Sequence, residues 1–263
     1  MSESTLAPST NPSAAATVAA LRSGEVLDRT AIYLDGQWVA SEGTGRIQVI
    51  DPATEQVIAE VAEGTPADVD KAVAAARAAF PAWSARPAAE RADFLQQTAD
   101  LLVARLEEFG EIASRDVGAP LEAAKAVQIG LPIFNFGHYA TLARSYDFDG
   151  YEVGNSLIVK EAMGVIGCIT PWNFPAAMIT RKVGPGWAAG CTGVIRPASQ
   201  TPFSALALAV LAERAGMPPG VCNVITGPSG PIGGELTSNP VVRKLSFTGS
   251  TEVGARLLAQ IAP

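Results

Sequence analysis

Three short segments of the chain combine residue types that suit nucleotide binding. They read ITPWNFP at residues 169–175, RPASQTP at 196–202 and FTGSTEVG at 247–254. Each follows an apolar run and leads into a helix-forming stretch. Small residues and hydroxyl groups at such a place let backbone N–H groups approach a phosphate or a ribose. A single short motif is weak evidence, so each segment also has a structural interpretation.

The segment Phe247-Thr248-Gly249-Ser250 closes a predicted strand and opens a predicted helix. The first turn of a helix has unpaired N–H groups and the positive end of the helix dipole, which favour an anion such as a pyrophosphate. Ser250 can contact that phosphate, and an ordinary helix N-cap is the alternative interpretation. The spacing differs from the three-glycine dinucleotide fingerprint, so a standard Rossmann motif does not follow.

Arg196 and Ser199 follow a predicted strand, at the carboxyl edge where doubly wound sheets bind ligands. A cation followed by a small hydroxyl suits the ribose of a nucleotide. A carboxylate there would pair with a free 2′-hydroxyl, whereas Ser199 leaves room for a 2′-phosphate that the planar fork of Arg196 can bind. The alternative is a solvated arginine followed by a helix cap.

Two prolines, Pro171 and Pro175, fix the turn that contains Trp172 and Asn173. The Asn173 amide is a donor that can point at a developing oxyanion, and such a donor contributes about 3 kcal/mol to transition-state stabilisation. The alternative is a buried asparagine that holds the loop together through bonds to the backbone.

No residue of the chain has the pattern of a catalytic nucleophile or a metal ligand set. Cys168 and Cys222 lie inside apolar runs, where cysteine is usually a small buried hydrophobe, and Cys191 lies in a turn without a nearby histidine or lysine. The single histidine, His138, lies on an aromatic helical face. Three cysteines without paired or metal-ligand spacing fit a reducing compartment, so we expect a cytoplasmic protein without a metal site.

From residue 164 onward, short apolar runs alternate with helical patterns, which indicates a doubly wound parallel sheet of the α/β class. The expected strands are 165–169, 192–195, 221–225 and 244–247, and the expected helices are 176–189, 203–215, 231–238 and 250–261. We therefore assign residues 164–263 to a Rossmann-like dinucleotide-binding region, whose strand ends bring the three segments together.

The preceding residues predict a helical and β-hairpin portion. Residues 1–29, rich in Ala, Ser, Thr and Pro, predict a disordered leader. Asp35-Gly36 predicts a hairpin turn because both positions favour positive φ. Within 30–150, the patterns predict a second strand pair, 46–50 with 56–61, and helices at 67–80, 88–114 and 120–146, the last interrupted near Gly130-Leu131-Pro132. Residues 151–163 predict a strand of a protruding hairpin.

Composition sets limits on function. The chain has 263 residues, 48% of them hydrophobic and 17% charged, with a net charge of −7. An acidic protein of this kind is not expected to bind nucleic acid or an anionic membrane through nonspecific charge. No apolar run reaches the roughly 18–20 residues of a membrane span, and no signal peptide is evident.

Taken together, the three segments resemble the aldehyde dehydrogenase superfamily, in particular its NADP-preferring succinate-semialdehyde dehydrogenases. The resemblance is nearly continuous from residue 169 to 254 and includes AAMITRK at 176–182 and LTSNP at 236–240. It is looser over residues 32–164 and absent before residue 30. It implies NADP, or NAD, as cofactor and a small aldehyde as substrate.

The resemblance also implies roles for single residues. Asn173 supplies the oxyanion-hole amide, Arg196 and Ser199 hold the adenosine ribose and 2′-phosphate, and Gly249 and Ser250 hold the pyrophosphate. The remaining positions expected at the cofactor are Ile169, Trp172, Lys182, Pro197, Ala198, Phe247 and Val253. In the family, a cysteine thiolate attacks the aldehyde, hydride passes to the nicotinamide, and a glutamate activates water to release the acid.

The chain departs from the family pattern in three places. Arg196 replaces the usual lysine, and Gly184-Pro185-Gly186-Trp187 replaces a stretch of small apolar residues. The resemblance covers only the N-terminal half of a family member, so the catalytic domain is expected to be absent and the chain alone inactive.

The resemblance further implies a homo-oligomer for the full-length form, with residues 151–163 in an oligomerisation arm. The alternative is a non-catalytic NADP-binding or interaction module derived from the family, or a fragment without its own function.

Overall fold

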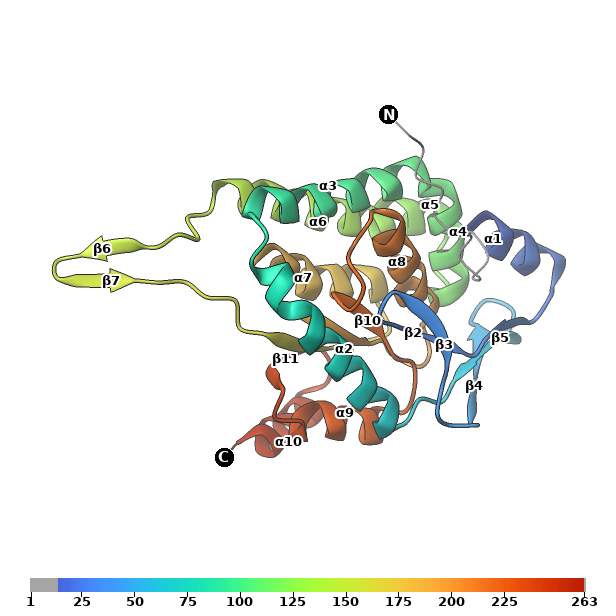
Figure 1. Ribbon diagram of the computed structural model, residues 1–263. Coiled ribbons are helices and arrows are strands. Elements are labelled where there is room, and N and C mark those ends of the chain that lie inside the picture. Colours follow the sequence, from blue (N-terminus) through green and yellow to red (C-terminus); the bar gives the residue numbers. More distant parts are fainter. Residues whose placement is uncertain (1–13, 263) are drawn as a thin grey trace.

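The central element of the computed structural model is a six-stranded sheet, and the structure describes residues 14–262 (Figure 1). Its strand order is β11-β8-β9-β10-β2-β3. Four strands run parallel, as the alternating pattern predicts: β8 (Val165–Ile169), β9 (Thr192–Arg196), β10 (Cys222–Val224) and β11 (Val242–Phe247). The α/β fold class inferred from the sequence is therefore confirmed.

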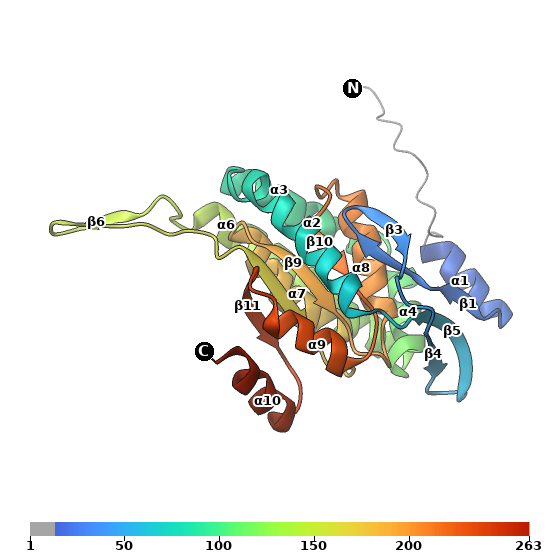
Figure 2. The same ribbon diagram turned by 60° about the horizontal axis from the view of Figure 1, so that its bottom comes forward.

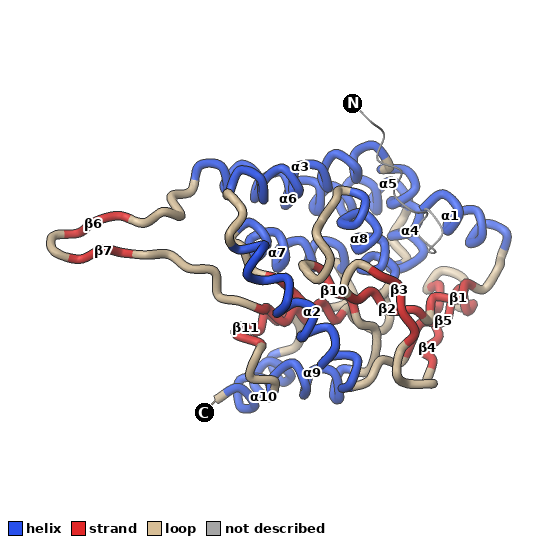
Figure 3. Tube along the Cα trace, in the orientation of Figure 1, coloured by secondary structure: helices blue, strands red, loops and turns tan. Residues whose placement is uncertain are grey.

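Helices cover both faces of this sheet. One core contains Ile166 and Cys168 of β8 together with side chains of α7 (Pro175–Ala188) and α8 (Phe203–Arg214). The other contains Val165 and Ile169 of the same strand with side chains of α2 (Pro66–Ser84) and α9 (Ser229–Ser238). Alternate residues of one strand thus enter opposite cores, as the pleat requires. Figure 3 shows the strands as a band between the helices.

The hairpin predicted at Asp35-Gly36 completes the sheet. Asp35 has φ 50° and Gly36 has φ 74°, the positive values that a tight hairpin turn needs. Its strands are β2 (Ala31–Leu34) and β3 (Gln37–Ala40), and β2 pairs antiparallel with β10. The Asn223 side-chain oxygen accepts a hydrogen bond from Asp35 N at 3.0 Å, which fixes the turn to the end of that strand pair.

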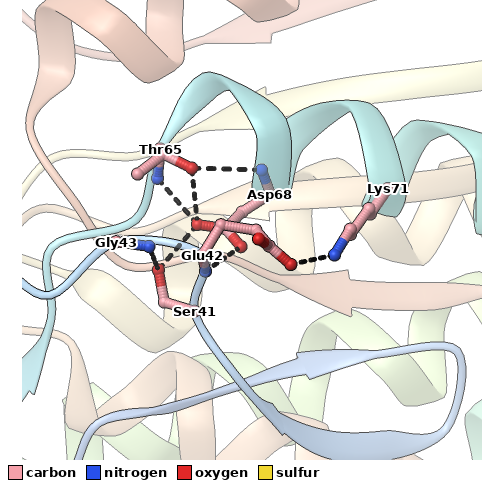
Figure 4. A network of polar contacts seen from close by, with 6 residues as sticks. All are labelled: Ser41, Glu42, Gly43, Thr65, Asp68 and Lys71. Carbon is pink, nitrogen blue, oxygen red and sulfur yellow. Dashed lines mark hydrogen bonds and ion pairs between the residues drawn. The ribbon is translucent and has the colours of Figure 1, made fainter.

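A network around Asp68 joins this hairpin to the start of α2 (Figure 4). The carboxylate accepts bonds from Ser41 Oγ at 2.7 Å, Glu42 N at 2.9 Å and Thr65 N at 2.8 Å. Thr65 and Asp68 form a capping box, and Lys71 pairs with Glu42. Burial alone raises the pKa of Asp68, but these hydrogen bonds outweigh it and hold the pKa below its usual range.

The N-terminal residues differ from the prediction. Residues 14–29 are not a disordered leader: α1 (Ala14–Ser23) buries Val18 and Leu21 in the larger core, and β1 (Leu27–Arg29) pairs parallel with β5. Three strands form this second sheet, in the order β1-β5-β4, with β4 at Arg46–Asp51 and β5 at Gln56–Ala62. Burial against distant residues orders a segment whose own pattern is weak. Residues 1–13 lie outside the described residues.

The long helical stretches are more divided than their periodicity suggests. The single helix expected at 88–114 is two helices, α3 (Ala88–Ala104) and α4 (Leu106–Val117), which separate at Arg105 with φ −124° and ψ 27°. The interruption expected near Pro132 is a π-helix instead. The helical stretch expected at 120–146 therefore consists of α5 (Leu121–Ala123), the π-helix η1 (Ala124–Ile129) and α6 (Gly130–Ser145).

Two elements extend from the body. The hairpin of β6 (Tyr151–Val153) and β7 (Ser156–Ile158) projects from the end of α6 as a separate two-stranded sheet (Figures 1 and 2). The last element, α10 (Thr251–Ile261), follows β11 and lies beside α9 (Figure 1). Within residues 14–262, no helix is both long and apolar enough to cross a membrane.

Candidate functional site

An open groove of about 640 Å³ lies at the carboxyl ends of β8, β9 and β11. All three segments identified in the sequence contribute to it, because parallel strands end at the same edge of a sheet. Its size falls within the ~300–1,000 Å³ typical of cofactor and small-molecule sites. The predicted residues that line it are Ile169, Trp172, Asn173, Arg196, Ala198, Ser199, Phe247, Gly249, Ser250 and Val253.

The loop after β8 is held by its backbone and exposes its side chains. Gln128 Nε2 donates to the Asn173 carbonyl oxygen at 3.1 Å, and Thr201 Oγ1 donates to the Trp172 carbonyl oxygen at 3.2 Å. The Trp172 side chain is 57% exposed, and Asn173 is exposed as well. The interpretation of Asn173 as a buried, loop-holding asparagine is therefore wrong. Its amide is free to meet a ligand in the groove.

Arg196 is not the solvated arginine of the alternative interpretation, since it is only 7% exposed. Its Nε and Nη2 donate to the Gly227 carbonyl oxygen at 3.2 and 2.8 Å. Ser199 Oγ accepts a bond from Arg196 Nη2 at 3.1 Å and donates to the same carbonyl at 3.0 Å. Burial lowers the pKa of Arg196 to about 10, so it remains a cation at neutral pH.

The loop after β11 presents the N-terminus of α10 to the groove. Ser250 is the N-cap, and its Oγ accepts a bond from Val253 N at 3.3 Å. A Cβ on Gly249 would collide with the Phe247 ring, so a larger residue there would have to displace this ring. Lys182 Nζ donates to Thr248 Oγ1 at 2.6 Å, and burial lowers the pKa of this lysine. This loop is thus anchored from α7.

Two expected residues do not line the groove. Pro197 is buried and is not part of the lining, and Lys182 contacts the lining through Thr248. Thr170, Pro171, Gln200 and Thr248 also line the groove and lie within the three segments, although the sequence assigned them no contact with the cofactor. Sequence reasoning missed Pro228 and Ser229, which lie outside those segments. Pro228 and Ser229 follow β10, so the rule that ligands bind at strand ends would have found them. The buried Thr170 hydroxyl has no hydrogen-bond partner among the described residues.

The charge of the groove suits a phosphate-bearing ligand. Among the described residues, none of those lining it is acidic, although the whole chain carries −7. The unpaired N–H groups of α10 and the nearby Arg196 favour an anion there. The lining of the groove thus suits an anionic ligand, although the net charge of the whole chain is negative.

The three cysteines lie outside the groove lining and are buried. Burial raises the pKa of both Cys168 and Cys222 to about 12, which disfavours the thiolate that a nucleophile needs. Across residues 14–262, the side chains of His, Cys, Asp and Glu form no group of three or more that could hold a metal ion. Among the described residues, no cysteine lines the groove.

Comparison with known proteins gives matches over most of the chain. The model of the aldehyde dehydrogenase family matches residues 38–263. A glutarate-semialdehyde dehydrogenase of Pseudomonas aeruginosa is 47% identical over 239 residues, which cover 90% of this chain and 50% of the relative. The NADP-linked succinate-semialdehyde dehydrogenase of Escherichia coli K12 is 45% identical over 240 residues, with the same coverage.

Solved structures show the same similarity. A mutant of aldehyde dehydrogenase C from Pseudomonas syringae, in complex with NAD⁺ and octanal, superposes with a TM-score of 0.86 at 40% identity. An NADP-dependent enzyme of E. coli gives a TM-score of 0.84 at 44% identity. They cover 88% and 89% of this chain, and 48% and 49% of their own chains are matched. The chain spans about half the length of the relatives it matches.

Proposed function

Because the chain belongs to the aldehyde dehydrogenase family, we propose that its groove binds the dinucleotide of an NAD(P)-dependent aldehyde dehydrogenase. The observation that carries the proposal is the meeting of three strand ends around one groove without acidic lining residues. Gly249 and Ser250 lie at the start of α10, where the pyrophosphate would bind. Arg196 and Ser199 would face the adenosine ribose.

We propose NADP rather than NAD as the preferred cofactor. Ser199 places a neutral hydroxyl beside the Arg196 guanidinium, so nothing there repels a 2′-phosphate. When bound, the oxidised nicotinamide supplies the acceptor for a hydride. The Asn173 amide would donate to the oxygen that gains charge when a nucleophile adds to the aldehyde.

The substrate class proposed is the semialdehyde of a small dicarboxylic acid, of the succinate-semialdehyde type. The support is similarity: relatives at 47% and 45% identity act on glutarate and succinate semialdehydes by name. We also propose that the full-length form is a homo-oligomer located in the cytoplasm. The unpaired cysteines support the location, since reducing compartments keep thiols free.

The first experiment measures NADP and NAD binding to the purified chain by calorimetry. Ser250→Asp tests the site, because aspartate is as good an N-cap as serine and keeps α10 intact, while its charge repels a phosphate. We expect NADP affinity to fall by at least about tenfold, or 1.4 kcal/mol. Ser238→Asp makes the same charge change at an exposed position outside the groove and serves as the control. A folded wild-type chain that binds neither nucleotide would refute the proposal.

A second candidate function is a non-catalytic NADP-binding module. The buried cysteines favour it, because no thiolate among the described residues faces the groove. It predicts NADP binding by this chain without turnover of succinic semialdehyde. Turnover that is lost on Cys191→Ser, or on replacement of another cysteine present here, would exclude this candidate.

A further inference from the structure

The π-helix η1 places a buried glutamine against the loop that carries Asn173. Gln128 is 6% exposed, and its Nε2 lies 3.1 Å from the Asn173 carbonyl oxygen. A carbonyl oxygen only accepts hydrogen bonds, so the amide nitrogen of Gln128 must be the atom that faces it. The Gln128 Oε1 is then buried, and it has no hydrogen-bond partner among the described residues.

Gln128 lies within the irregular turn of this helix, shortly before a proline. In an α-helix, the carbonyl of residue 128 would accept from residue 132, which is a proline without an N–H. The turn before this proline is a π-helix, in which Gly130 N donates to the Lys125 carbonyl five residues earlier and to the Val127 carbonyl. π-Turns are rare and frequently occur at functional sites. Both the wide turn and an unpaired buried oxygen cost stability, which points to a role other than stabilising the helix.

The contact fixes the backbone of the loop and leaves its side chains free. Gln128 holds the Asn173 carbonyl, and Thr201 holds the neighbouring Trp172 carbonyl at 3.2 Å. The side chains of Trp172 and Asn173 remain exposed in the groove lining. With two successive carbonyl groups held, the backbone of Asn173 is constrained, and with it the direction of its Cα–Cβ bond.

We propose that Gln128 is a positioning residue that orients Asn173, so that its amide is held ready for an oxyanion in the groove. The proposal rests on the proposed function, because only that function gives Asn173 an oxyanion to bind. A donor for developing charge must be fixed before the reaction to be effective. Gln128 acts on the backbone of the donor residue and does not contact the substrate.

The test uses Gln128→Met, which keeps the length and volume of the side chain but removes the N–H donor. The measurement is amide hydrogen exchange of residues 172–174 in the full chain without nucleotide, together with the melting temperature. We expect exchange at these amides to accelerate by at least about tenfold. In the variant, the loop can open without first breaking the bond between Gln128 and the Asn173 carbonyl. The melting temperature should move by less than about 2 °C, because the change also removes the unpaired Oε1.

The same variant should bind NADP at least about threefold more weakly, because a mobile loop must be ordered on binding. Gln96→Met, at a partly exposed position on α3, is the matched control and should change neither property. If Gln128→Met does not fold, Gln128→Leu, a strong helix former without a donor, takes its place.

The outcomes separate this proposal from the function on which it rests. Unchanged exchange at residues 172–174 in a folded donor-less variant overturns the role of Gln128, whatever the chain binds. Faster loop exchange in a chain whose wild type binds neither NADP nor NAD refutes the proposed function instead, and with it the purpose assigned to the contact.

Discussion

The proposed preference for NADP depends on the uncharged side chain of Ser199. Its hydroxyl bonds to the Arg196 guanidinium and to the Gly227 carbonyl, so it is held in place without carrying charge. In dinucleotide sites, a carboxylate at the ribose pairs with a free 2′-hydroxyl and repels a 2′-phosphate. The choice between NADP and NAD should therefore respond to charge at this position.

Ser199→Glu should reverse the preference for NADP. Two like charges about 4 Å apart repel by roughly 4 kcal/mol at a protein surface, so a loss of NADP affinity of at least about tenfold is a conservative expectation. NAD affinity should change by less than about threefold, because NAD lacks the 2′-phosphate. Parallel titrations measure both. Ser238→Glu, outside the groove, controls for the added charge, and equal losses for the two nucleotides would contradict the assignment of this end of the groove.

At this scale the sequence predicted residue types better than residue contacts. Ser250 was recognisable as a helix N-cap because its neighbours define the helix start. The burial of Arg196 was not, since its acceptor, the Gly227 carbonyl, is 31 residues away and is brought close by the pairing of β9 with β10. Lys182 and Thr248 meet across a still longer separation of 66 residues. Local pattern does not contain such contacts.

At the level of elements, periodicity predicted the strands and helices, but it did not predict how closely they pack. The strands and helices after residue 164 follow their patterns closely. The stretch Gly184-Pro185-Gly186-Trp187, which departs from the family pattern, places two glycines and a proline inside α7. In the structure, a Cβ on Gly184 would lie 2.6 Å from Tyr139, and one on Gly186 would lie 2.5 Å from Ile166. The glycines let α7 approach its neighbours closely, and Trp187 stacks on Phe136 at 6.0 Å.

The start of α8 depends on a buried carboxyl group of α4. Asp116 is 2% exposed and accepts bonds from Ser204 N at 3.0 Å, Ser204 Oγ at 2.9 Å and Phe203 N at 3.3 Å. Burial raises the pKa of Asp116 to about 7, although these hydrogen bonds oppose the change. Between about pH 4 and pH 7, Asp116 is therefore protonated in the folded protein. In the unfolded chain, where the pKa of aspartate is about 3.9, it has already lost this proton.

This group should make the protein less stable as pH rises. A raised folded-state pKa gives a contribution that is complete below about pH 4 and is lost as pH rises through about 7. The free energy of unfolding should fall over that window, by up to about 4 kcal/mol from this residue. In Asp116→Asn the free energy of unfolding should change less between pH 4 and pH 7. The weaker cap at the start of α8 should lower this free energy by about 1 kcal/mol at all pH values. Urea unfolding at several pH values measures both effects.

The control for that series is Asp100→Asn, which removes one carboxyl group at an exposed position. The comparison between the two variants isolates the buried group from the general change in charge. An Asp116→Asn variant whose stability still falls between pH 4 and 7 as steeply as in the wild type would show that Asp116 does not titrate in this range.

For the whole molecule, the sequence did not reveal how its N-terminal part joins the sheet. The hairpin β2–β3 was recognisable from its turn, but its pairing with β10 joins Tyr33 to Val224, and no local pattern encodes that contact. The same holds for α2, whose apolar stripe was evident while the sheet face that it covers was not. The boundary predicted at residue 150 thus separates strands that belong to the same six-stranded sheet.

The projecting hairpin β6–β7 is the part of the molecule least covered by its own chain. In the described structure no third strand pairs with it, so backbone N–H and C=O groups are unpaired along its edges. Its exposed apolar side chains are Tyr151, Val153, Leu157, Ile158 and Val159. A two-stranded hairpin alone is only marginally stable in water. These properties favour pairing with another chain, and they support the proposed homo-oligomer.

The chain should accordingly self-associate through this hairpin. Leu157 is 65% exposed, and burying such a side chain contributes roughly 1.5–3 kcal/mol, whereas a buried lysine would oppose contact. Leu157→Lys should weaken association at least about tenfold in sedimentation analysis. NADP binding should persist, because the hairpin is separate from the groove lining. Leu258→Lys makes the same change on α10, at 67% exposure. If that variant alone dissociates the assembly, the surface of α10 forms the contact and the hairpin does not.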